Sequence, residues 1–340
     1  MPRRFSIFLL VMALTVLTLT IFGTAFATPN KGADCSRCHN STPTPPLPSN
    51  TTPQKATGLS CTKTSTDVLK SCNFGADDDY WLAIAKCDNL FTSNDLKACK
   101  KQALEEKISG KEDCMAQHAV RKEICKDLGQ AAYNPVINPA DFSTTINNQY
   151  FPLKPKTTFI YEGTKEGKIE HVEVKVTDKT KVILGVTCVE VRDTGTIDGV
   201  LAEDTLDWYA QDKDGNVWYF GENSVEYDAS GEIVSLEGSW KAGVDGAMPG
   251  IIMKAAPQVG DLYRQEFALG EAEDMAEVLS LNESLLVNSV TYNNCLKTKE
   301  FSPLEPDVLE NKFYAPGVGN IRTFDTVSGE FLDLVQIKTE

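Results

Sequence analysis

The chain has 340 residues, with 33 lysines and arginines against 48 aspartates and glutamates, a formal net charge of −15 at pH 7. Residues 141–340 hold 17 basic and 35 acidic residues, whereas residues 61–128 hold 11 and 12. This acidic balance excludes nucleic acid and anionic membrane surfaces as expected partners. It indicates either a surface built for solubility or an acidic docking face.

Residues 1–27 have the pattern of a secretory signal peptide. Arginines stand at positions 3 and 4, an apolar run covers 7–22, and an A-x-A cleavage site follows at 25–27. The apolar run is short for a membrane span and no second one follows, so we expect no membrane-spanning segment after signal removal. The predicted location is periplasmic or extracellular, and an oxidising compartment explains the ten cysteines.

Residues 28–60 form a tail rich in proline and threonine that contains Cys35-Ser36-Arg37-Cys38-His39. C-x-x-C-H is the attachment signature of c-type haem, in which Cys35 and Cys38 bind the vinyl groups and His39 is the iron ligand. The tail offers no globular pocket for a porphyrin. A Cys35–Cys38 disulfide or an intermolecular bond explains the same residues, so one covalent haem and none both remain open.

Residues 61–128 contain six cysteines in a mirror arrangement that predicts a helical hairpin. The spacings are 11 and 15 residues in the first arm and 15 and 11 in the second, and an antiparallel hairpin pairs residues of constant index sum. The block lacks a paired C-x-x-C, which disfavours a metal site. We therefore predict three disulfides, Cys61–Cys125, Cys72–Cys114 and Cys87–Cys99.

The two arms differ in their helical signals. In the first arm, Asn73-Phe74-Gly75 predicts a break between a short piece near 65–72 and a firmer helix near 77–90. In the second arm, Ser93 or Asn94 is a suitable N-cap and Gly129 a suitable stop.

Residues 129–149 are predicted to be a linker, and residues 150–340 an antiparallel β domain of about ten strands with period-two alternation. Asp214-Gly215 fits a two-residue hairpin turn, which places Ala210 opposite Tyr219. Cys188 and Cys295 are the only cysteines of this domain, and we predict that they form a disulfide. The other strands are expected at 157–162, 168–176, 181–192, 261–268, 275–287, 296–301, 309–315, 318–325 and 331–338.

Two segments give the β domain a resemblance to a known architecture. The opening YFPLKP at 150–155 and the late FYAPGVGNI at 313–321 resemble secreted bacterial proteins with a half-open β-barrel, an architecture shared with the lipoprotein-localisation factors of the periplasm. The resemblance covers about 190 residues and implies a strongly curved antiparallel sheet. With the disulfide-stapled α-hairpin predicted from the cysteine spacing, the expected fold class is α+β. The resemblance also implies that the concave face of the sheet can take a hydrophobic ligand.

No set of catalytic residues converges in the sequence. His118 and His171 are interpreted as structural and solvent-facing, and Asp212 to Asn216 as a turn rather than a calcium loop. The acidic pairs around Glu203 and Glu273 are interpreted as solvated acids, because no pocket is evident that would raise a pKa. The tryptophans Trp208, Trp218 and Trp240 are expected in the core, with the lining of a concave face as the alternative.

The sequence thus predicts an exported, non-enzymatic binding or envelope-scaffold protein. Its expected partner is a hydrophobic small molecule or an envelope protein, and the ligand-binding residues and the oligomeric state stay unassigned. The alternative is electron transfer by a monohaem c-type cytochrome-like protein with haem at Cys35, Cys38 and His39.

Overall fold

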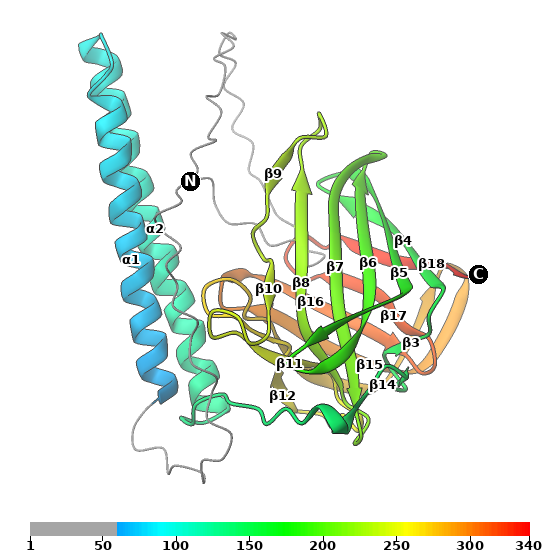
Figure 1. Ribbon diagram of the computed structural model, residues 1–340. Helices are drawn as coiled ribbons and strands as arrows, with labels where there is room; N and C mark the ends of the chain where they lie inside the picture. The colour runs from blue at the N-terminus through cyan, green and yellow to red at the C-terminus, as the bar shows by residue number, and fades with distance from the viewer. Residues whose placement is uncertain (1–59) are drawn as a thin grey trace. The chain divides into compact units, whose positions relative to one another are not determined.

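The first folded part of the chain is a pair of long antiparallel helices (Figure 1). The structure, a computed structural model, describes residues 60–340. Helix α1 spans Ser60–Cys87 and helix α2 spans Ser93–Asp127. Three disulfides join them, with Cα–Cα distances of 5.6, 5.8 and 5.6 Å. They pair Cys61 with Cys125, Cys72 with Cys114 and Cys87 with Cys99, so the predicted ladder is confirmed.

Helix α1 is continuous, and the predicted break at residues 73–75 is therefore wrong. The side-chain amide of Asn73 donates to the carbonyl oxygen of Leu69 at 2.8 Å. Because the Asn73 amide is hydrogen-bonded within the helix, it does not bind the backbone groups that would form a turn. The disulfides at Cys72 and Cys87 also hold both ends of the segment against α2.

The N-cap of helix α2 lies before both predicted caps, Ser93 and Asn94. Thr92 is the N-cap, and its hydroxyl accepts a hydrogen bond from the backbone N–H of Asp95 at 3.1 Å. At the other end Leu128 is the C-cap, and Gly129 follows with φ +87°. Gly129 thus ends the helix as predicted.

The rest of the chain forms a large antiparallel sheet that nearly closes on itself, which confirms the α+β fold with a curved, barrel-like sheet (Figure 1). Its strand order is β12-β14-β15-β16-β17-β18-β4-β5-β6-β7-β8-β11-β13. The pairing of β18 with β4 joins the last strand to the first long one. The strands are β4 Thr157–Lys165, β5 Lys168–Ile183, β6 Val186–Ile197, β7 Val200–Asp212, β8 Val217–Tyr227, β9 Ile233–Ser235, β10 Trp240–Lys241, β11 Met248–Met253, β12 Leu262–Arg264, β13 Glu266–Phe267, β14 Met275–Val287, β15 Val290–Ser302, β16 Glu305–Ala315, β17 Gly319–Asp325 and β18 Phe331–Thr339.

Short elements before residue 150 already belong to this fold. The 3₁₀ turn η1 covers Pro139–Asp141 and strand β1 covers Phe142–Ser143, which pairs with β7. Strand β2, Ile146–Asn147, pairs with β3, Pro152–Leu153. The second half of the segment predicted as a linker is therefore attached to the β domain.

The geometry of two turns corrects the predicted strands. The segment 181–192 is not one strand, because Leu184 and Gly185 have φ of +50° and +80° and form the tight turn between β5 and β6. The β7–β8 turn is one residue longer than predicted, so Ala210 pairs with Trp218 instead of Tyr219. The Asp212 carboxylate fixes this turn by accepting hydrogen bonds from Asp214, Asn216 and the Trp218 indole.

The predicted disulfide between Cys188 and Cys295 is wrong. Both cysteines are buried and free. Cys188 lies on β6 and Cys295 on β15, and β16, β17, β18, β4 and β5 stand between these strands in the sheet order. The prediction relied on their being the only two cysteines of the domain. Each is instead packed as a small apolar residue within its own strand.

A buried ion pair connects helix α2 to the β domain. The guanidinium of Arg121 donates to both carboxylate oxygens of Glu273, at 2.8 and 2.7 Å, and the two side chains are 5% and 2% exposed. Glu273 also accepts from the backbone N–H of Gly270 at 2.8 Å. In the part of the chain that the structure describes, no helix combines the length and apolar character needed to cross a membrane.

Candidate ligand-binding cavity

The inner face of the sheet surrounds an open-mouthed cavity of about 150 Å³. Its walls come from alternate residues of neighbouring strands, because successive side chains of a strand point to opposite faces. On β7 the alternating wall residues are Glu203, Thr205, Asp207 and Tyr209, and Ala202 joins them near the start of the strand. On β6 the wall residues are Val191, Asp193, Gly195 and Ile197.

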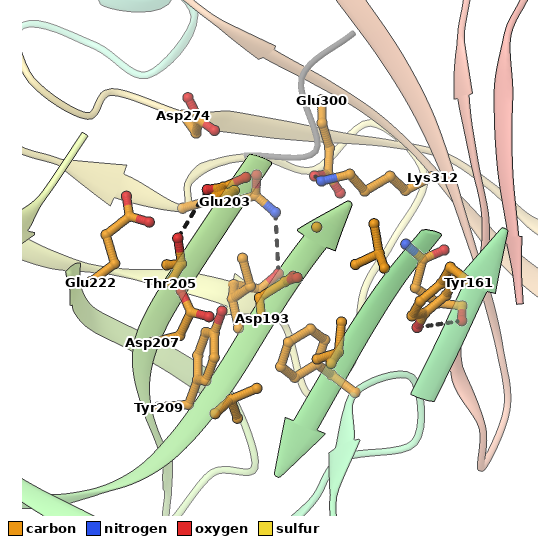
Figure 2. Close-up of a pocket in the computed structure, with 18 of the residues that line it drawn as sticks. Tyr161, Asp193, Glu203, Thr205, Asp207, Tyr209, Glu222, Asp274, Glu300 and Lys312 are labelled. Carbon is orange, nitrogen blue, oxygen red and sulfur yellow. Dashed lines mark hydrogen bonds and ion pairs between the residues drawn. The ribbon is translucent and has the colours of Figure 1, made fainter. Parts of the chain in front are cut away.

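The cavity wall mixes apolar and acidic side chains (Figure 2). Its apolar part includes Phe151, Leu153, Val172, Val174 and Ile252. Against two lysines, Lys165 and Lys312, the wall carries eight carboxyl groups: Glu170, Asp193, Glu203, Asp207, Glu222, Glu266, Asp274 and Glu300. The interior is therefore amphipathic, and its charged groups are predominantly acidic.

Some acids of the wall lie directly opposite another acid on a paired strand. Asp207 of β7 faces Glu222 of β8, and Glu300 of β15 faces Glu310 of β16. Like charges in directly opposite positions destabilise a sheet. Such an arrangement is characteristic of sites that serve a purpose other than stability.

Hydroxyl groups satisfy part of the acidic wall. Glu203 accepts hydrogen bonds from Thr205 at 2.9 Å and from Ser224 at 3.1 Å. Glu300 accepts from Thr298 at 2.9 Å and from Tyr314 at 2.8 Å. These hydroxyl groups fix the orientation of the two carboxyl groups.

Lys312 supplies positive charge to the same region. Its ammonium group lies 2.8 Å from Glu300 and 3.6 Å from Glu310. Burial by itself lowers the pKa of Lys312, but the neighbouring Glu300 and Glu310 produce a net rise. Lys312 therefore stays charged, and its charge is already shared between these two carboxylates.

Two buried carboxyl oxygens of cavity-lining residues have no hydrogen-bond partner among the described residues. They are Oε1 of Glu222 and Oε1 of Glu266, whose side chains belong to residues only 4% and 2% exposed. A buried polar atom without a partner costs about 1–3 kcal/mol. Since both residues line the cavity, a bound donor is the direct way to satisfy them.

Burial changes the protonation of the acidic wall. It raises the pKa of Glu203 to about 8, of Asp207 to about 7 and of Asp274 to about 6, against ordinary values near 4. Burial and then the neighbouring acids raise the pKa of Glu222 and Glu266 well above the ordinary range. In the empty cavity, part of the wall is therefore neutral at pH 7.

The acids at Glu203 and Asp274 correct the sequence interpretation, which treated them as solvated. Glu203 shares the inward face of β7 with Tyr209, and Asp274 stands immediately before β14 at the cavity wall. Glu273 is engaged by Arg121. The sequence does contain one indication of this position. Glu203 and Asp207 are an even number of residues from Tyr209, so the three side chains share one face of the strand.

The remaining predicted residues fall into three groups. The haem-motif residues Cys35, Cys38 and His39 lie outside the described residues. Nδ1 of His118 is 2.8 Å from the Ser65 hydroxyl between the helices, and His171 lies 3.6 Å from both Glu162 and Glu173. Trp208 and Trp240 are buried in the core and Trp218 packs against it, as predicted.

Comparisons with known proteins give little. No family model matches the chain, and no curated protein is similar to it. A solved structure of a putative lipoprotein from Parabacteroides distasonis is similar with a TM-score of 0.32 and 14% sequence identity, over 56% of this chain and 99% of that one. A similarity of this size carries no conclusion about fold or function.

Proposed function

We propose that this is an exported, non-enzymatic binding protein whose β domain holds a small molecule with an apolar body. The observation that carries the proposal is the cavity, because side chains line the inner face of the sheet without filling it. Concave sites with apolar walls and a few placed polar groups are the usual form of small-molecule sites. The three disulfides of the hairpin support export, since such bonds persist in oxidising compartments.

The test uses the full exported chain and the neutral fluorescent probe N-phenyl-1-naphthylamine. Val191 lies on the cavity wall and is 2% exposed, whereas Val182 is 66% exposed on the neighbouring strand β5. We expect Val191→Phe to weaken probe binding about tenfold or more by occupying the cavity, and the matched control Val182→Phe to bind as the parent does.

Mass spectrometry of the purified protein provides the second measurement. We expect a co-purified small molecule that is recovered chemically unchanged after prolonged incubation. Equal probe binding by both variants, or no probe binding by the parent, would contradict the proposed site. Conversion of the recovered molecule would contradict the non-enzymatic part.

A second candidate function, electron transfer, is favoured by the C-x-x-C-H motif alone. Here one haem would be attached at Cys35 and Cys38 with His39 as iron ligand. A pyridine haemochrome spectrum, recorded after export from a host with active cytochrome c maturation, tests it. This function predicts a c-type α-band that is lost in Cys35→Ala, Cys38→Ala, and absence of the band in the parent protein excludes it.

A further inference from the structure

Acids from three separate strands contribute to one part of the cavity wall. Asp207 lies on β7, Glu222 lies opposite it on β8, and Glu266 begins β13. Glu266 is near enough to Glu222 for its charge to contribute to the raised pKa of that group. We call these three residues the acid wall; Figure 2 shows Asp207 and Glu222 on the same side of the cavity as Tyr209.

The acid wall has unused acceptors. Asp207 already accepts a hydrogen bond from the Tyr219 hydroxyl at 2.5 Å. Oε1 of Glu222 has none within the described part of the chain, and the carboxyl of Glu266 has the Trp240 indole as a neighbouring donor. An alcohol donates a single hydrogen bond, whereas a primary ammonium donates three and supplies the opposite charge.

An aromatic series connects the acid wall to the apolar wall. Tyr219 stacks on Tyr209 with ring centroids 4.6 Å apart, and Tyr209 meets Phe151 edge-to-face at 5.4 Å. Tyr209 and Phe151 both line the cavity. A ligand with an apolar body on Phe151 therefore reaches the acid wall past an aromatic ring, a surface that also attracts cations.

The other ligand classes fit less well. An anion would meet an excess of carboxyl groups, since Lys312 is already engaged by Glu300 and Glu310. Among residues 60–340, no group of three or more His, Cys, Asp and Glu side chains is arranged to hold a metal ion. A neutral ligand would leave acceptors of the acid wall without donors.

We propose that the cavity binds an amphipathic organic cation, with a primary ammonium group on the opposed pair Asp207 and Glu222, beside Glu266, and an apolar body against Phe151 and Tyr209. This inference rests on the proposed function and specifies its ligand class.

Binding is coupled to proton release. In the empty cavity burial keeps protons on part of the acid wall. An entering ammonium replaces a proton, which passes to the buffer, so affinity rises by up to about tenfold per pH unit while that acid is protonated. The charged groups that face the acid wall from the surrounding strands are Lys165, Glu170, Asp193, Glu203, Asp274, Glu300 and Lys312. The titratable tyrosines there are Tyr161, Tyr209, Tyr219 and Tyr314.

The experiment compares three probes that share a ten-carbon chain: decylammonium, 1-decanol and decanoate. Isothermal titration of the full exported chain at pH 7.5 should rank them in that order, with decylammonium at least tenfold tighter than 1-decanol. Glu222→Gln should reduce this preference at least fivefold. Glu232→Gln, at an exposed position of the β8–β9 connection, is the matched control and should behave as the parent.

The outcomes separate the two proposals. Equal binding of all three probes, or tightest binding of decanoate, would overturn the cation assignment while the binding function stands. Failure of every probe, together with no N-phenyl-1-naphthylamine binding, would overturn both. Glu266→Gln gives a second reading of the acid wall, and thermal melts of each variant establish that it is folded.

Discussion

The helical hairpin and the β domain are stabilised by different means. Helix α1 buries only Ser65 and Cys87 along 28 residues, and Phe74 and Trp81 remain 70% and 64% exposed. The β domain instead has a continuous core whose largest fully buried side chains include Tyr219, Phe220 and Met253. Covalent links thus take the place of a core in the hairpin.

The core of the β domain also supports a polar interior. Its interior contains acids in opposed pairs, such as Asp207 with Glu222 and Glu203 with Glu226. Each such pair costs free energy. A large apolar core offsets that cost, so the domain can maintain a polar cavity that the thin hairpin could not.

Reduction of the disulfides should have the largest effect and should act on the hairpin alone. The chain-entropy relation gives about 3–4 kcal/mol for each bridge, more for the longer loops. With dithiothreitol, we expect the helical circular dichroism at 222 nm to fall, while the near-ultraviolet signal of the buried Trp208 and Trp240 persists. Retention of helicity after all six thiols have been counted as reduced would show that the hairpin core is sufficient by itself.

The second effect, of intermediate size, concerns the pH dependence of the β domain. The folded pKa of Glu203 is raised to about 8 from 4.5, so the folded state holds its proton more tightly than the unfolded chain. The stabilisation is present below pH 4.5 and is lost as the pH rises towards 8. Burial raises the pKa of Asp207 and Glu310 in the same direction, to about 7 and about 8.

Thermal melts followed in the near ultraviolet at pH 5, 6, 7 and 8 should therefore show a falling midpoint. Glu203→Gln should remove part of this slope, on the order of 1 kcal/mol after allowance for the water that reaches the cavity. Glu232→Gln, with an exposed side chain, serves as control and should leave the slope as it is. A stability that stays level or increases between pH 5 and 8 would show that these carboxyls are ionised in the folded state.

The same contrast explains what the sequence could and could not predict. The hairpin was predictable because a disulfide demands a fixed spacing, and the cysteine positions encode it directly. The cavity was not, since on β7 both faces are apolar: Trp208 and Ala210 are buried on one face and Tyr209 on the other. The alternation of side chains along the strand therefore separates the two faces, but it does not show which face lines the cavity with Glu203 and Asp207.

Local hydrogen bonds account for the errors in register. The Asp212 carboxylate accepts four bonds from the following loop, and this adds one residue to the turn that Asp214-Gly215 alone would make. No propensity rule contains such a set of contacts. The pairing of Cys188 with Cys295 failed for a related reason, because strand order is a property of the whole sheet.

The smallest expected effect comes from replacing a glycine of the hairpin by alanine, which can be compared with the same replacement in the β domain. A Cβ at Gly110 of α2 would lie 3.5 Å from Cβ of Ala76, an ordinary van der Waals contact, whereas at Gly250 of β11 it would lie 2.2 Å from the carbonyl oxygen of Gln265. Gly110→Ala should therefore stabilise the hairpin by about 0.5–1 kcal/mol, the usual gain for alanine over glycine inside a helix. Gly250→Ala should destabilise the sheet, because the backbone has to move.

Gly75→Ala is the control for the hairpin, since its Cβ would meet nothing within 4 Å and only the helix propensity changes. Melts at 222 nm should show both hairpin variants raised by a similar amount. If Gly110→Ala lowers the midpoint while Gly75→Ala raises it, the helices need glycine at Gly110 for their close approach. The hairpin would then have a tightly packed contact of its own, and its stability would no longer rest on the three disulfides alone.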